Sequence, residues 1–167
     1  MTKTKPTVLP LICICFILFT TITGCKKEPH CEYLICKNGG ECHADTCACA
    51  PGYFGALCEN AIRDQFLGNY VGNLYLVTPI GTDTLPNVSI TVAAGPDSVM
   101  EVTLTSSNLG TLKGAISMGG GLNVPSQTNT FGSVSAAGSF YGNTLNFSYS
   151  EVTVILTVNG SFTGTKQ

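Results

Sequence analysis

The stretch TLNFSYSEVTVILTVNG (Thr144–Gly160) decides the fold of the larger part of this 167-residue chain. Its first half places an apolar residue at every second position, including Phe147 and Tyr149, with asparagine or serine between them. A period of two is the pattern of a β-strand with one buried face. The apolar residues then continue with the opposite parity from Val152 onward, so we expect a turn or bulge near Ser150–Glu151.

The same alternation recurs upstream, where Val88, Ile90 and Val92 alternate with Ser89 and Thr91. Short clusters rich in glycine, asparagine and proline separate the runs, and such clusters mark turns. They are PIGTD (Pro79–Asp83), AGPDS (Ala94–Ser98), SSNLG (Ser106–Gly110), MGGGLN (Met118–Asn123) and YGN (Tyr141–Asn143). The pattern predicts an all-β fold: an antiparallel meander of seven or eight short strands, closed as a barrel or packed as a sandwich.

Nine cysteines occupy the first 58 residues, and the remainder of the chain has none. Two lie in an apolar N-terminal run, Cys25 follows that run, and six form a cluster. The six are Cys31, Cys36, Cys42, Cys47, Cys49 and Cys58. The cluster spans about 30 residues, which bury too little apolar surface to fold alone, so we expect disulfides to stabilise it. The spacing of six cysteines by itself leaves many pairings open.

The end of the cluster, CACAPGYFGALC, resembles the signature of epidermal growth factor (EGF)-like domains, with Gly55 as the signature glycine. The resemblance implies a disulfide-rich EGF-like module at residues 31–58. A zinc site is disfavoured because the CAC spacing is unusual for zinc, although His43 is adjacent. A calcium site is also disfavoured, because Asp45 lacks the following aromatic of calcium-binding modules. The pairs that the family implies are Cys31–Cys42, Cys36–Cys47 and Cys49–Cys58.

The N-terminus has the form of an export signal: two lysines within the first five residues, then an apolar run, then small residues. Its last residues, ITGC (Ile22–Cys25), resemble the lipobox of bacterial lipoproteins. The resemblance implies a signal peptide at 1–24 and a Cys25 that carries lipid, including a fatty acid such as palmitate. A simple secreted protein and a retained membrane anchor are the alternatives. Cleavage before Cys25 would leave seven cysteines. Six of them can pair, and lipidation of Cys25 accounts for the seventh.

The remaining boundaries follow from this reading. Residues 25–30 would be a lipidated linker, 59–66 a second linker with at most one helical turn, and 67–167 the β-domain. Lipid on Cys25 would place the protein at the cell envelope. Lys26 stands where an aspartate retains enteric lipoproteins at the inner membrane, which favours the outer membrane and allows surface exposure.

The β-domain weakly resembles small lipocalin-like domains of Bacteroidetes-type lipoproteins, since Gly68 and Tyr70 stand near a Gly-x-Trp position. Its aromatic residues are interpreted as core, with the lining of a ligand cavity as the alternative. They are Phe66, Tyr70, Tyr75, Phe131, Phe140, Tyr141, Phe147, Tyr149 and Phe162. A carrier of a small apolar ligand would require several of them around a cavity.

The β-domain offers little for catalysis, because it contains neither histidine nor cysteine. We expect no catalytic residue, no metal site and no cofactor. Glu101 and Glu151 are expected on solvent faces, and only their convergence in a cleft would support a glycoside hydrolase. Thr84 and Ser98, in DTL and DSV, are candidate O-glycosylation sites by resemblance to Bacteroidetes-type motifs, and both are expected in loops.

The charge balance disfavours nucleic-acid binding, because only 11% of residues are charged and the net charge is -2. The favoured interpretation is a non-enzymatic envelope lipoprotein. Its EGF-like module would act as a spacer that presents the β-domain to an envelope protein or glycan. The alternatives are the apolar-ligand carrier and, less favoured, an envelope hydrolase.

Overall fold

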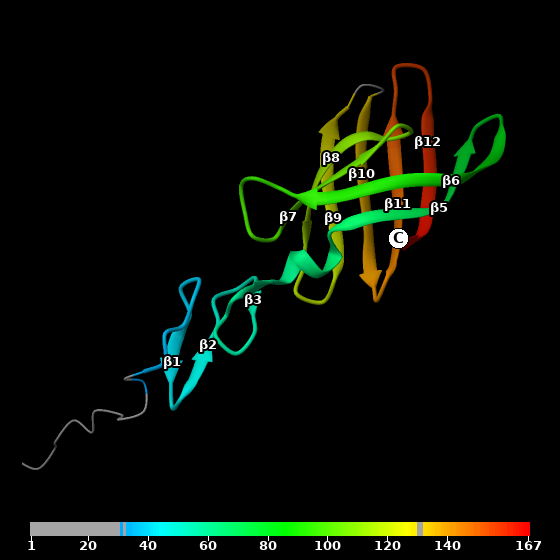
Figure 1. The fold of residues 1–167 in the computed structure, drawn as a ribbon. Coiled ribbons are helices and arrows are strands. Elements are labelled where there is room, and N and C mark those ends of the chain that lie inside the picture. Colours follow the sequence, from blue (N-terminus) through cyan, green and yellow to red (C-terminus); the bar gives the residue numbers. More distant parts are fainter. Residues whose placement is uncertain (1–30, 32, 130–131) are drawn as a thin grey trace, which may run out of the picture.

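The structure is a computed structural model that describes residue 31 and residues 33–129 and 132–167. A small disulfide-bonded module precedes an eight-stranded barrel, and the module lies at one side of the barrel (Figure 1). The expected signal peptide, the Cys25 that we expect to carry lipid, and the aromatic Phe131 all lie outside the described residues. Within the described part of the chain, no helix has both the length and the apolar character needed to cross a bilayer.

The module contains two short antiparallel ladders held by three disulfides. Strand β1 (Glu41–His43) pairs with β2 (Thr46–Ala48), and β3 (Tyr53–Phe54) pairs with β4 (Asn60–Ala61). Nearly all of its side chains are exposed or half-buried, so cross-links replace the missing apolar core. The disulfides join the pairs that the EGF-like resemblance implied: Cys31–Cys42, Cys36–Cys47 and Cys49–Cys58.

The β-domain is a closed antiparallel barrel in which every strand pairs with the next along the chain, and the last returns to the first. This confirms the eight-stranded meander and decides for a barrel over a sandwich. Its strands are β5 (Gly68–Thr78), β6 (Gly81–Ala94), β7 (Glu101–Ser106), β8 (Gly110–Ile116), β9 (Gly121–Thr128), β10 (Ser133–Tyr141), β11 (Thr144–Val152) and β12 (Thr157–Lys166). The end of the β5–β6 hairpin projects beyond the barrel (Figure 1).

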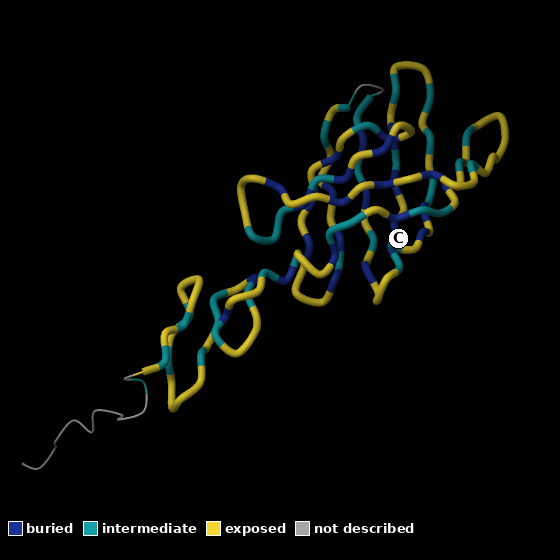
Figure 2. Tube along the Cα trace, in the orientation of Figure 1, coloured by how far each residue is buried: buried dark blue, intermediate teal, exposed yellow. Residues whose placement is uncertain are grey.

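Apolar side chains from every strand fill the interior of the barrel. The buried residues are the dark blue segments of the chain in Figure 2. The rings of Phe147 and Phe162 stack with their centroids 5.5 Å apart, and the ring of Tyr70 meets the edge of Phe140 at 5.7 Å. The gap beside Phe147 is too small to hold a water molecule. Most of the aromatic residues therefore form a packed core, as the favoured interpretation predicted.

Residues 59–66, expected to be a linker, form a packed joint between the module and the barrel. Strand β4 leads directly into the 3₁₀ helix η2 (Ile62–Phe66), and both Ile62 and Phe66 are buried in the barrel core. Arg63 lies between them and its Nη1 donates hydrogen bonds to the carbonyl oxygens of Gly95 and Glu101. The joint thus ties the β6–β7 loop to η2.

The turn or bulge expected near Ser150–Glu151 lies further along the chain, because β11 continues through both residues to Val152. The chain reverses instead at residues 153–156, where the Thr153 hydroxyl donates to the carbonyl oxygen of Leu156 at 2.9 Å. A threonine side chain that bonds its own turn competes with strand pairing. Val154 and Ile155, despite their strand propensity, lie fully exposed at this tip.

Candidate ligand-binding surface

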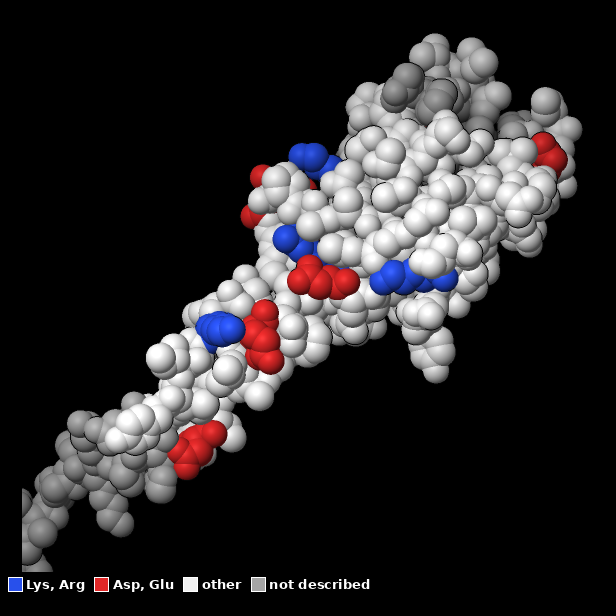
Figure 3. All heavy atoms as spheres, viewed as in Figure 1, with Lys and Arg blue, Asp and Glu red and all other residues white. Residues whose placement is uncertain are grey.

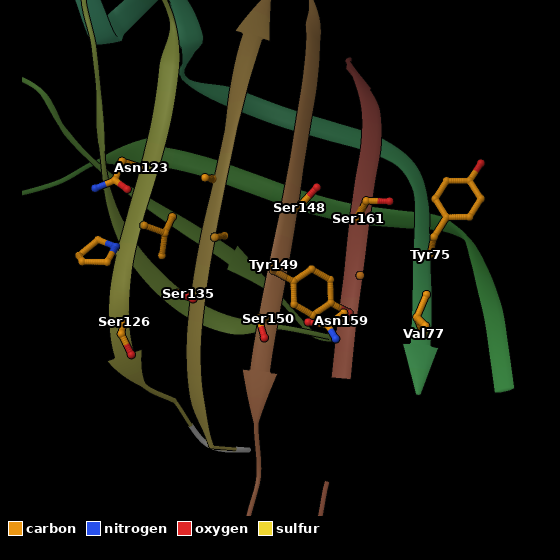
Figure 4. A pocket seen from close by; sticks show the side chains of 15 residues that line it. Tyr75, Val77, Asn123, Ser126, Ser135, Ser148, Tyr149, Ser150, Asn159 and Ser161 are labelled. Carbon is orange, nitrogen blue, oxygen red and sulfur yellow. The ribbon is translucent and has the colours of Figure 1, made fainter. Parts of the chain in front are cut away.

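A shallow open trough of about 770 Å³ crosses the outer face of five adjacent strands, from β9 through β10, β11 and β12 to β5 (Figure 4). Its lining side chains come from residues up to 86 positions apart in the sequence, between Tyr75 and Ser161. The floor is made of small residues such as Ser135, Ala137 and Ser148. The exposed large side chains of the lining, Tyr75 and Val77, lie at one edge, so the trough can receive an extended molecule.

The strand register arranges the lining residues in rows that run across the sheet. Directly opposed residues have side chains on the same face and within contact distance of one another. One row, followed from β9 to β6, is Asn123, Ala137, Ser148, Ser161, Tyr75 and Thr84. A second row, from β10 to β6, is Ser135, Ser150, Asn159, Val77 and Thr82. Hydroxyl and amide groups therefore repeat at the spacing of neighbouring strands.

One edge of the trough carries its exposed aromatic side chain. Tyr75 and Val77 on β5 are 43% and 49% exposed, and both stand at the same edge in Figure 4. Tyrosine offers an apolar ring together with a polar hydroxyl, and it loses little conformational entropy on binding. The opposite edge carries Asn123, Pro125 and Ser126 of β9. The trough thus combines one aromatic edge with a polar floor.

No charged side chain is among the residues that line the trough. Its polar groups are serine hydroxyls, the amides of Asn123 and Asn159 and the hydroxyl of Tyr75, which both donate and accept hydrogen bonds. In the face of the molecule seen in Figure 3, charged side chains gather near the joint, and most of the visible barrel surface is uncharged. The chemistry of the trough therefore suits a neutral ligand rich in hydroxyl groups.

The two glutamates that a hydrolase would need do not converge. Glu101 begins β7, and its main-chain oxygen contacts Arg63 at the joint. Glu151 accepts a hydrogen bond from Asn129, whose amide also contacts Leu109 beyond the other end of β7. The two residues thus lie about 17 Å or more apart, from the length of that strand. The solvent-face prediction is also wrong for Glu151, which is buried, and inexact for Glu101, which is half-buried.

The two candidate O-glycosylation residues occupy different settings. Thr84 is exposed but lies on strand β6 opposite Tyr75, so the expectation of a loop is wrong there. Ser98 does lie in the β6–β7 loop, and its hydroxyl oxygen accepts a hydrogen bond from the amide of Met100.

The eight described aromatic residues of this set divide between the core and the surface. Tyr75 and Tyr149 line the trough, Tyr141 is exposed at a turn, and the other described members are buried. Tyr149 is otherwise buried, and its ring lies against Gly160, where an added Cβ would come within 2.5 Å of it. Sequence reasoning missed the trough, since nothing marked its serines as neighbours. Among the described residues, no group of three potential metal ligands is close enough to hold an ion.

Comparisons with known proteins add one partial similarity. No family model matches the chain, and no solved structure matches it. The chain is 34% identical over 56 residues to Protein eyes shut of Drosophila melanogaster, an EGF-like-containing protein. The aligned part covers 33% of this chain and 3% of that protein. Together with the three disulfides, this similarity fits an EGF-like module.

Proposed function

We propose that this protein is a non-enzymatic, lipid-anchored component of the cell envelope whose barrel binds a neutral glycan in the outer trough. The observation that carries the proposal is the lining of the trough: small hydroxyl and amide side chains on the floor, Tyr75 at the edge, and no charge. Sugars present hydroxyl groups on their edges and apolar C–H groups on their faces. A polar floor beside one exposed ring is complementary to both.

The geometry favours an extended glycan over a ligand enclosed in the barrel. The trough is open along its length and its floor is nearly flat, whereas the interior is filled by packed side chains. An apolar-ligand carrier would need several aromatic residues around a cavity, and six of them contribute to the core instead. We therefore propose the outer face of the barrel as the binding surface.

The envelope location rests on the ITGC motif at Ile22–Cys25 and its place after an apolar run. In this proposal, lipid on Cys25 holds the chain at the membrane and the EGF-like module separates the barrel from it. Two or more acyl chains give stable anchoring, whereas one chain gives only marginal binding. We expect the N-terminal peptide of the protein from its own host to begin at Cys25 and to carry acyl mass. An unmodified Cys25 in that peptide would contradict the anchor and leave the trough proposal intact.

Binding of glycans to the full chain, in detergent or nanodiscs, tests the trough. We expect a neutral polysaccharide to bind, and Tyr75→Ala to weaken that binding by about tenfold or more, because the ring face is lost. The matched control is Tyr141→Ala, which removes an exposed tyrosine outside the trough. We expect this control to bind like the unchanged protein.

A second variant tests the floor without touching the core. Ser148 is exposed in the middle of β11, so Ser148→Trp should fill the trough while the barrel still folds. We expect Ser148→Trp to abolish glycan binding. The proposal fails if no neutral glycan binds, or if the Tyr75 and Tyr141 variants lose affinity equally. Capture of a protein that depends on Tyr75 in place of any glycan would also overturn it.

A further inference from the structure

A second cleft lies at the end of the barrel that carries the β11–β12 turn, away from the module. It measures about 340 Å³, and four aliphatic side chains form most of its wall. These are Leu74, Leu76, Leu85 and Val158. Polar groups of Asn108, Tyr149, Glu151 and Thr153 complete the lining. A small apolar site with a few converging polar groups is the usual form of a ligand pocket.

Glu151 is the charged member of this lining, and it is only 7% exposed. It follows Phe147 and Tyr149 at spacings of two along β11, so its side chain lies on the inner face of the barrel. One carboxylate oxygen accepts a hydrogen bond of 3.2 Å from the side-chain amide of Asn129. That amide also donates to the carbonyl oxygen of Leu109, at 3.0 Å. A carboxylate accepts about four hydrogen bonds, so one amide leaves most of its capacity unused.

No cation compensates this buried carboxylate within residues 33–129 and 132–167. The ion pairs in that part of the chain involve other acids, and no lysine, arginine or histidine lines the cleft. A second acid, Asp83, lies opposite Leu76 in the β5–β6 register and therefore on the same face of the hairpin. Burying a carboxylate without a positive partner costs free energy. The cleft is thus preorganised for a positive charge.

Tyr149 adds a polar group beside the carboxylate. Burial, together with the nearby charge of Glu151, raises the pKa of Tyr149 to about 12, so the phenol keeps its proton at neutral pH. Tyr149 therefore contributes a neutral hydroxyl group to the lining of the cleft. The neighbouring wall is aliphatic, and it can receive an apolar group of a few carbon atoms.

We propose that this cleft at the end of the barrel, called the mouth cleft below, binds a small primary ammonium ion that carries an apolar group. The ammonium donates hydrogen bonds to the unoccupied oxygen positions of Glu151, while the apolar group packs against Leu74, Leu76 and Val158. This proposal does not depend on the glycan trough, although Tyr149 lines both sites. Its ligand class follows from one buried, uncompensated carboxylate above an aliphatic wall.

Cyclohexylammonium chloride is a suitable probe, because it is compact, water-soluble and charged at neutral pH. Its binding to the full chain in phosphatidylcholine nanodiscs can be measured by saturation-transfer NMR, with empty nanodiscs as the blank. Cyclohexanol and cyclohexanecarboxylate keep the ring and change the charge. We expect both to bind at least about tenfold more weakly than the ammonium ion.

Glu151→Gln keeps the shape of the side chain and removes its charge. We expect it to weaken ammonium binding by at least about tenfold, to the level of cyclohexanol. The matched control is Asp97→Asn, an exposed acid 3.9 Å from Lys113 and outside the cleft, which should leave binding unchanged. Equal binding of the alcohol and the ammonium ion, no binding of the ammonium ion, or equal losses in the two variants would each overturn the proposal. If Glu151→Gln does not fold, the preference of the unchanged protein for the ammonium ion decides the question.

Discussion

Replacing Gly72 with alanine is expected to lower the free energy of unfolding of the barrel by about 3 kcal/mol or more. Gly72 faces Gly164 where β5 pairs with β12, the contact that closes the barrel. A Cβ at this position would lie 2.0 Å from the carbonyl oxygen of Thr163 and 2.4 Å from the Cα of Gly164. These are main-chain atoms, so no rotamer change relieves the clash and the two strands must separate.

Thermal or urea unfolding followed by circular dichroism measures this loss. The matched control is Gly119→Ala in the turn between β8 and β9, where nothing lies within 4 Å of the added carbon. We expect the control to change stability by less than about 1 kcal/mol, and in the stabilising direction. A total stability of about 5–15 kcal/mol is typical for a domain, so the Gly72 variant should melt at a clearly lower temperature. If both variants unfold alike, the close approach of β5 and β12 is not what Gly72 provides.

The alternation of apolar and polar residues was enough to predict the all-β class and the meander, because each strand has one buried and one exposed face. The turns predicted from glycine, proline and asparagine lie at the ends of the strands, whereas the turn predicted near Ser150–Glu151 from the change of apolar parity is displaced. That prediction failed because Val154 and Ile155 look like strand residues but lie at an exposed tip. Barrel closure requires β11 and β12 to pair over nine residues, from Thr144–Thr165 to Val152–Thr157, and this pairing prevails over local preference.

Neither candidate site was visible in the sequence, for a physical reason. The trough consists of serine, alanine and asparagine on outward positions, where such residues are ordinary. They become a surface only because the register sets Ser148 beside Ser161 and Ser161 beside Tyr75. The mouth cleft depends on the parity of β11, and the predicted turn at Ser150–Glu151 would have put Glu151 in solvent. Because the turn lies at residues 153–156, strand β11 continues past Ser150, and Glu151 is the next residue on its inner face.

The two sites share Tyr149, whose ring covers Gly160 on one side and lines the mouth cleft on the other. A ligand in the cleft therefore contacts the same side chain that closes part of the trough floor. The separate variants Ser148→Trp and Glu151→Gln distinguish the two surfaces, because each changes a residue that lines only one of them.

Removing the Cys49–Cys58 disulfide is expected to unfold the second half of the module while the barrel stays folded. Cys58 is fully buried, although most of the module is not, and Asn38 donates to its carbonyl oxygen at 2.7 Å. Lys37 likewise donates its amide to the carbonyl oxygen of Leu57. The disulfide thus holds Cys58 where Lys37 and Asn38 form hydrogen bonds to the segment that enters the joint. Loss of a native disulfide from a small domain costs about 2–5 kcal/mol, which is comparable to the whole stability of such a unit.

Hydrogen exchange measured by mass spectrometry on Cys49→Ala/Cys58→Ala follows each part separately. We expect fast exchange in residues 49–61 and unchanged protection in β7 to β12, because the barrel core includes no residue before Ile62. The matched control, Cys31→Ala/Cys42→Ala, removes the disulfide farthest along the chain from the joint, and residues 49–61 should keep their protection. Loss of protection throughout the barrel would contradict this division and show that the module and barrel unfold as one unit. In that case the module would stabilise the binding face directly, and it would not act as a spacer alone.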